Sequence, residues 1–98
     1  MNHEVLPIST LVDCYHALID LEEREYQRDK EVCAASFSFK DGINELSRLL
    51  ESEEVAKKAF EELLRRGFLV ELGHGFYRTL HMDIACRIAN VKIKHGTM

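Results

Sequence analysis

The stretch SEEVAKKAFEELLRRGFLVELGHGFYRT, residues 52–79, decides the fold of this chain. It begins with Ser52, a good N-cap, and two glutamates follow where carboxylates suit the positive end of a helix. Gly67 comes directly after two arginines and is expected to take the left-handed conformation that ends a helix. Between these signals the apolar residues recur at helical spacing, which predicts a buried stripe of Val55, Ala56, Ala59, Phe60, Leu63 and Leu64.

A β-hairpin is predicted directly after this helix. Residues 68–72 and 76–79 are two short apolar and aromatic runs. Gly73, His74 and Gly75 separate them as a three-residue link in which the glycines can adopt positive φ. We therefore expect a helix that passes through one glycine into a tight hairpin.

An amphipathic helix is expected near the N-terminus, after an extended lead at residues 1–8. Ser9 or Thr10 is its expected cap, with Asp13 in a position like that of a capping box. Residues 22–30 are polar and are expected to extend this helix beyond the core, as a solvated end or a partner surface. The expected buried stripe consists of Leu11, Cys14, Tyr15, Leu18 and Leu21.

A short strand and a second helix are expected between residues 34 and 51. Phe37 and Phe39 alternate with small residues, so both are expected to face the core from a strand. Asp41 is the expected N-cap of a short helix. The apolar positions of that helix are Ile43, Leu46, Leu49 and Leu50.

A last helix is expected over residues 80–93. Thr79 is a reasonable cap, and Asp83 suits an early turn. Such a helix packs on the first one, forms a dimer seam or leads into a further domain, and these alternatives stay open. The apolar positions at helical spacing are Leu80, Ile84, Ile88 and Val91.

This order of elements resembles a winged-helix domain over roughly residues 9–80. The resemblance rests on order and spacing rather than on any single residue. It implies an α+β fold, a winged helix-turn-helix with a three-helix core, a short strand plus β-hairpin wing, and an added C-terminal helix. We then expect a single winged-helix domain over residues 1–98, with a lead at 1–8, a core at 9–80 and the C-terminal helix at 80–93.

A second resemblance concerns residues 75–87, GFYRTLHMDIACR. This segment is similar to one that follows an N-terminal winged helix in some superfamily 2 helicase-like proteins, just ahead of the ATPase core. The resemblance implies an accessory domain of a larger nucleic-acid-processing protein. The 98 residues contain no ATPase motif, so any such activity would lie elsewhere.

Composition predicts a folded, cytoplasmic protein. No apolar run approaches the roughly 20 residues that span a bilayer, and the N-terminus has neither the basic start nor the apolar stretch of a secretory signal.

The three cysteines have no CxxC spacing and are expected to be reduced thiols. The net charge of −4 argues against strong unconditional binding of nucleic acid, although residues 78–98 hold four basic residues against one acid.

No pattern of residues indicates catalysis, a metal or a cofactor. The Gly73–Gly75 link lacks the lysine and the strand-to-helix context of a phosphate-binding loop, and neither GxSxG nor HExxH occurs. The five histidines are scattered, and Cys14 and His16 point in different directions on a helix. We therefore expect a protein that is not an enzyme, with no catalytic residues, no metal and no cofactor.

The winged-helix resemblance implies contact with DNA through the third helix and the wing. The outward face of that helix holds three acids and three bases, with Glu54–Lys58 and Glu61–Arg65 as expected ion pairs. Glu53 and Glu54 at its start oppose the approach of phosphate. The candidate nucleic-acid-binding residues are Lys57, Lys58, Arg65, Arg66, His74 and Arg78.

The alternative is a winged helix used for protein–protein assembly or dimerisation without nucleic acid. Fold-level resemblance alone does not decide between the two uses. The expected assembly surfaces are the acidic first helix and an apolar patch of Leu80, Ile84 and Ile88 on the last helix. The expected partners are therefore DNA, and a protein or a second copy of the chain, but no membrane.

Overall fold

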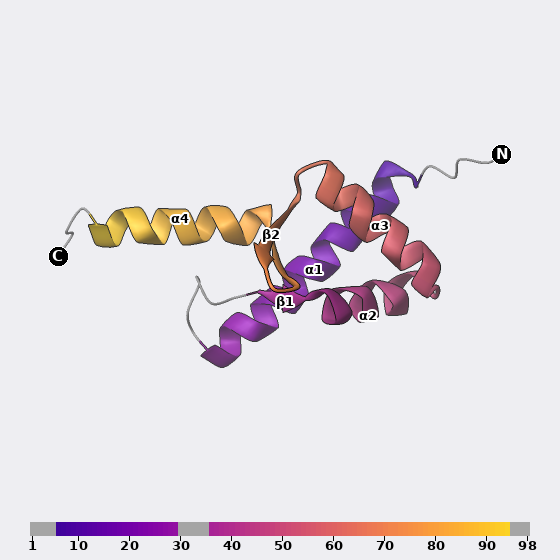
Figure 1. Ribbon diagram of the computed structural model, residues 1–98, viewed down its shortest axis with the longest axis horizontal. Helices are drawn as coiled ribbons and strands as arrows, with labels where there is room; N and C mark the ends of the chain where they lie inside the picture. Colours follow the sequence, from indigo (N-terminus) through magenta and orange to yellow (C-terminus); the bar gives the residue numbers. More distant parts are fainter. Residues whose placement is uncertain (1–5, 30–35, 95–98) are drawn as a thin grey trace.

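The computed structural model describes residues 6–29 and 36–94, and the fold is α+β, as the sequence predicts (Figure 1). Three helices pack together, a small antiparallel sheet lies beside them, and a fourth helix leads away from the sheet. Within the described ranges no helix is long and apolar enough to cross a membrane. The elements run in the order α1 (Ile8–Asp29), β1 (Phe37–Ser38), α2 (Phe39–Leu50), α3 (Glu53–Arg65), β2 (Leu69–Gly73), β3 (Phe76–Thr79) and α4 (Leu80–Lys94).

Helix α1 begins slightly earlier than its expected caps. The N–H of Leu11 donates to the carbonyl of Pro7 at 3.1 Å, so Pro7 precedes the first turn and neither Ser9 nor Thr10 is the cap. Proline suits a helix start because its fixed φ and missing N–H do no harm there. The expected stripe of α1 is buried or half-buried, and the helix does extend through the polar run to Asp29.

Helix α2 also begins earlier than expected. The Oγ of Ser38 accepts the N–H of Asp41 at 3.1 Å, so Ser38 is the N-cap and the prediction of Asp41 is wrong. Because Ser38 caps the helix, β1 has only two residues and Phe39 starts α2. Phe37 is buried as predicted, whereas Phe39 is 40% exposed, so the prediction that both face the core from a strand is wrong for Phe39.

Helix α3 follows the prediction closely. The Oγ of Ser52 accepts the N–H of Val55 at 3.1 Å, which is the expected N-cap. Gly67 has a φ of 86°, and the N–H of Phe68 donates to the carbonyl of Leu63 at 2.9 Å, so the helix ends at the expected glycine. The buried positions are Ala56, Ala59, Phe60 and Leu63.

The hairpin has a tighter turn than the expected three-residue link. Gly73 pairs with Phe76, so only His74 and Gly75 remain in the turn. Their φ values of 57° and 80° are the positive values that a type I′ turn requires. The irregular register between Glu71 and Gly73 is a bulge in β2. Strand β3 lies in the middle of the sheet, between β1 and β2.

Phe60 of α3 joins the helices to the sheet. Its ring centroid lies 5.0 Å from that of Tyr77, 5.1 Å from that of Phe39 and 6.3 Å from that of Phe37, all in edge-to-face arrangements. Helix α2 approaches this cluster through Gly42, where a Cβ would lie 2.9 Å from the Phe60 ring. The aromatic cluster and the missing side chain of Gly42 therefore set how closely α2 packs.

Helix α4 packs on one side only. Met82, Asp83 and Cys86 are buried, whereas Ile84 and Ile88 are 47% and 53% exposed. Figure 1 shows that α4 extends away from the three-helix body after its first turns. The face of α4 that carries Ile84 and Ile88 is therefore exposed to solvent.

The cysteines differ from the expectation in one respect. Cys14 is a free thiol buried on α1, and burial raises its pKa to about 11. Cys86 on α4 is disulfide-bonded. The prediction of reduced thiols therefore holds for Cys14 and is wrong for Cys86, and the third cysteine, Cys33, lies outside the described residues.

Candidate functional site

The outward side of α3 carries Lys57 and Lys58, and both are exposed. The Nζ of Lys57 lies 3.6 Å from Glu53 Oε2. Among the described residues Lys58 has no ion-pair partner, so the expected pair with Glu54 is replaced by the Glu53–Lys57 pair one residue earlier. Exposed lysines with loose or no partners are the groups on this helix most able to meet phosphate.

Glu62 holds both arginines at the end of α3. The Nε of Arg66 donates to Glu62 Oε2 at 2.5 Å, and Arg65 donates to the same oxygen. These bonds replace the expected pair between Glu61 and Arg65. Hydrogen bonds from Arg65 and Arg66 hold the pKa of Glu62 down at about 2, so the carboxylate stays ionised. One carboxylate shared by two guanidiniums leaves one positive charge here.

Arg78 of β3 forms an ion pair with Asp83 of α4, at the junction between the two elements. Its Nη2 and Nε lie 2.9 and 3.0 Å from Asp83 Oδ1, and its side chain is 15% exposed. The Nε of Arg87 donates to the other oxygen of Asp83 at 3.0 Å. Because Asp83 is 4% exposed, the two arginines neutralise a buried carboxylate, and Arg78 is mostly a structural group.

His74 is exposed at the tip of the hairpin, in the type I′ turn. In Figure 1 the start of α3 lies at one edge of the molecule, whereas the hairpin lies near the middle. The structure therefore brings Arg65 and Arg66 together around Glu62, but it does not gather all six candidate residues into one cluster.

Glu22 is a group whose importance the sequence did not reveal. It is fully buried on α1, although it begins the run predicted to be polar and solvated. Its Oε2 accepts the N–H of Thr79 and its Oε1 accepts the Thr79 hydroxyl, both at 2.5 Å. Burial raises the pKa of Glu22 to about 7, although the hydrogen bonds from Thr79 and the positive charge of Arg78 act to lower it. The only signal was its helical spacing, four residues after the buried Leu18.

These contacts belong to a set that satisfies the start of α4. The Thr79 hydroxyl accepts the N–H of Met82 at 3.2 Å, which confirms Thr79 as a cap. The N–H of His81 donates to the Tyr15 hydroxyl at 3.0 Å, and the N–H of Leu80 donates to the carbonyl of Phe68 at 2.9 Å. The first N–H groups of α4 are therefore bound by α1, the start of the hairpin and its own cap.

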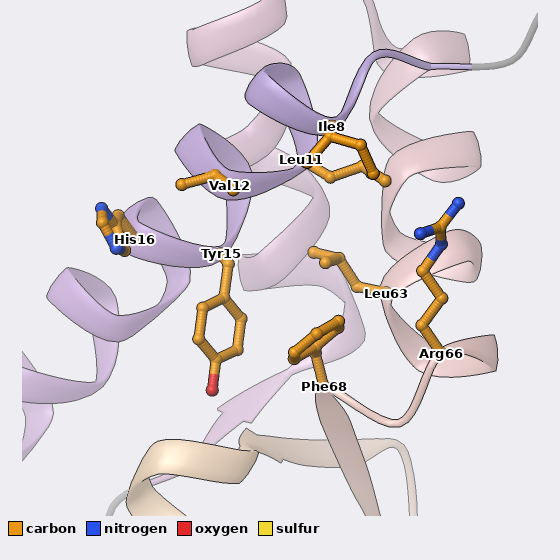
Figure 2. Close-up of a pocket in the computed structure, with 8 residues that line it drawn as sticks. All are labelled: Ile8, Leu11, Val12, Tyr15, His16, Leu63, Arg66 and Phe68. Atoms are coloured by element: carbon orange, nitrogen blue, oxygen red, sulfur yellow. The ribbon is translucent and has the colours of Figure 1, made fainter.

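A pocket of about 290 Å³ lies between α1 and the end of α3 (Figure 2). Leu11 and Leu63 are its buried walls, and the exposed Arg66 guanidinium reaches along it from the end of α3. No residue signal indicated this pocket, because it forms where two helices distant in sequence meet. Its lining residues are Ile8, Leu11, Val12, Tyr15, His16, Leu63, Arg66 and Phe68.

We searched the described residues for a cluster of side chains that could bind a metal ion. There, no three histidine, cysteine, aspartate or glutamate side chains lie close enough together to hold a metal ion. Two carboxyl groups with shifted pKa values, Glu22 and Glu62, both have protein partners.

Comparison with protein-family models finds no match to this chain, and no curated protein or solved structure matches it closely enough to inform its function.

Proposed function

We propose that the chain is a non-catalytic winged-helix module that contacts DNA through α3 and the wing, as an accessory part of a larger nucleic-acid-processing protein. The observation that carries the proposal is the outward side of α3, where Lys57 and Lys58 stand exposed. Exposed ion pairs such as Glu53–Lys57 are weak in water, so a phosphate can replace the glutamate. The order of helices and hairpin supports the resemblance to a winged helix.

The remaining candidate residues contribute unequally to this proposed contact. Arg65 is exposed and can exchange Glu62 for a phosphate, and His74 is exposed at the wing tip. Arg78 remains bound to Asp83. Two acids at the start of α3 still oppose phosphate, so binding is expected to be weak and strongly dependent on salt.

The proposed role as an accessory part rests on residues 75–87, the stretch that resembles helicase-like proteins. In this chain the stretch forms β3 and the first half of α4. Its polar residues bind one another: Arg78 and Arg87 hold Asp83, and Thr79 caps the helix. A segment of this kind stiffens the connection from the wing into α4.

Anisotropy of labelled duplex and single-stranded DNA at about 50 and 200 mM salt tests the proposal. Two to three phosphate contacts predict micromolar binding whose logarithm falls with the logarithm of salt at a slope of about −2 to −3. The variant Lys57→Glu/Lys58→Glu should remove binding. The matched control Lys40→Glu/Arg48→Glu makes the same charge change on exposed positions of α2. Absence of binding at 50 mM salt, or equal loss in both variants, would refute the proposed contact.

A second candidate function is assembly with a second copy of the chain through α4. The observation that favours it is the exposure of Ile84 and Ile88 one turn apart on a helix that projects from the body. The start of α4 is firmly bound, so this face is presented in one direction. Sedimentation equilibrium should show a dimer that Ile84→Glu/Ile88→Glu dissociates and that Leu49→Glu, on an exposed site of α2, leaves intact. A monomer at high protein concentration would rule this function out.

A further inference from the structure

The pocket between α1 and the end of α3 combines buried apolar walls with an exposed apolar rim (Figure 2). Leu11 and Leu63 are 4% and 2% exposed, whereas Ile8, Val12 and Phe68 are 61%, 45% and 41% exposed. Three large apolar side chains around one pocket leave a substantial apolar surface exposed to solvent. A hollow of this kind is typical of a ligand-binding site, because a ligand would cover that area.

The aromatic wall of the pocket is held in place by contacts within the protein. The rings of Tyr15 and Phe68 meet edge to face, with centroids 5.4 Å apart. The Tyr15 hydroxyl is bound by the N–H of His81, and the N–H of Phe68 is bound by the Leu63 carbonyl. The wall is therefore formed before any ligand arrives, which reduces the entropy lost on binding.

The pocket offers a binding group for an anion. Arg66 lines it, and its Nε is bound to Glu62 while its guanidinium extends along the pocket toward Ile8 (Figure 2). The bond to Glu62 uses Arg66 Nε, and among the described residues no contact engages the two terminal nitrogens of this guanidinium, so they can bind an anion at the pocket. A guanidinium pairs best with a carboxylate or a phosphate, and the apolar walls require an apolar body on the same molecule.

We propose that this pocket binds a small apolar carboxylic acid, with its hydrocarbon part against Leu11, Leu63 and Phe68 and its carboxylate at Arg66. The volume of about 290 Å³ suits a molecule with one ring or a short chain. The site differs from the proposed DNA contact at Lys57 and Lys58, so either proposal can fail without the other.

Isothermal titration and ¹H–¹⁵N spectra of the 98-residue chain test this with three probes. Phenylacetate has both the apolar body and the carboxylate, phenylacetamide has the same shape without the charge, and acetate has the charge alone. Phenylacetate should bind with a dissociation constant of about 1 mM or tighter, in the range expected for a ligand of this size. The amide should bind at least about fivefold more weakly, and acetate should not saturate.

Two adjacent arginines provide a matched pair of variants. Arg65 and Arg66 share Glu62, but only Arg66 lines the pocket. Arg66→Gln should weaken phenylacetate at least about fivefold and leave the amide unchanged, whereas Arg65→Gln should change either by less than about twofold. Val12→Asp, at an exposed rim position, should abolish binding without disturbing the core.

Three results would overturn the proposal. The first is no saturable binding of phenylacetate up to about 10 mM, well above the expected constant. The second is equal weakening by Arg65→Gln and Arg66→Gln, which would show that only the overall charge of the surface matters. The third is equal binding of the acid and the amide, which would show an apolar site with no role for Arg66.

Discussion

Glu22 of α1 and Thr79 at the end of β3 are 57 positions apart in the sequence and share two hydrogen bonds of 2.5 Å. Thr79 donates both its N–H and its hydroxyl to the carboxylate, while its oxygen accepts the N–H of Met82. A buried carboxyl group on the first helix therefore holds the residue that caps the last helix. This contact ties the direction of α4 to the three-helix body.

The stability of the protein should depend on the ionisation of Glu22. Its pKa in the folded state is about 7, above the ordinary 4.5, because burial disfavours the charge. The folded chain therefore keeps a proton that the unfolded chain has lost, and this stabilisation is complete below about 4.5 and disappears as pH rises through 7. The difference corresponds to on the order of 3 kcal/mol. Urea unfolding between pH 5 and 8 should show the free energy of unfolding falling with pH.

The variant Glu22→Gln should flatten this dependence, because the amide occupies the site without charge. At pH 8 it should be more stable than the parent chain. The matched control is Glu23→Gln, at an exposed neighbouring position, which should keep the parent slope. An unchanged slope in Glu22→Gln would mean that other groups cause the dependence.

The two arginines on Asp83 should contribute very differently to stability. Arg78 is mostly buried and Arg87 is 77% exposed. Arg78→Gln should cost about 1–3 kcal/mol because Asp83 stays buried with one exposed partner. Arg87→Gln should cost less than about 1 kcal/mol, as an exposed pair does. Chemical denaturation of both variants measures the difference, and equal costs would contradict this account of Asp83.

Gly42→Ala should destabilise the protein although alanine is the better helix former. Propensity favours alanine by about 1 kcal/mol in a helix interior. The new methyl group would lie 2.9 Å from the Phe60 ring and 3.1 Å from the Phe37 ring, and overpacking of a core costs about 1–3 kcal/mol. We expect a net loss in thermal unfolding, with the exposed Asn44→Ala on the same helix as a control within about 0.5 kcal/mol of the parent. A gain in Gly42→Ala would show that α2 can shift.

Two serines near helix starts should respond differently to removal of the hydroxyl. Ser52 caps α3, so Ser52→Ala should cost about 1 kcal/mol. Ser9 lies inside α1 and is exposed, so Ser9→Ala should change stability by less than about 0.5 kcal/mol. Denaturation midpoints compare the two, and a larger effect at Ser9 would place the start of α1 where the sequence suggested.

The sequence by itself determined the elements that depend on near neighbours. Helix α3 begins after Ser52 and ends before Gly67, as expected. An N-cap needs a hydrogen-bond partner only three residues away, and a positive φ is allowed by the glycine itself. The hairpin and the buried stripes were predictable for the same reason. The caps of α1 and α2 were predicted wrongly because several nearby residues offer the same local bond, and only packing selects one.

The tertiary structure alone decided the contacts between distant segments. Nothing near Glu22 in the sequence indicates that Thr79 will cover it, and nothing near Arg66 indicates that α1 will form a pocket beside it. The choice of Glu62 as the partner of both arginines likewise depends on side-chain conformations that spacing leaves open. Burial, ion pairs and pockets form where segments distant in sequence meet. The interactions that stabilise them are therefore made only in the folded chain, and local sequence does not reveal them.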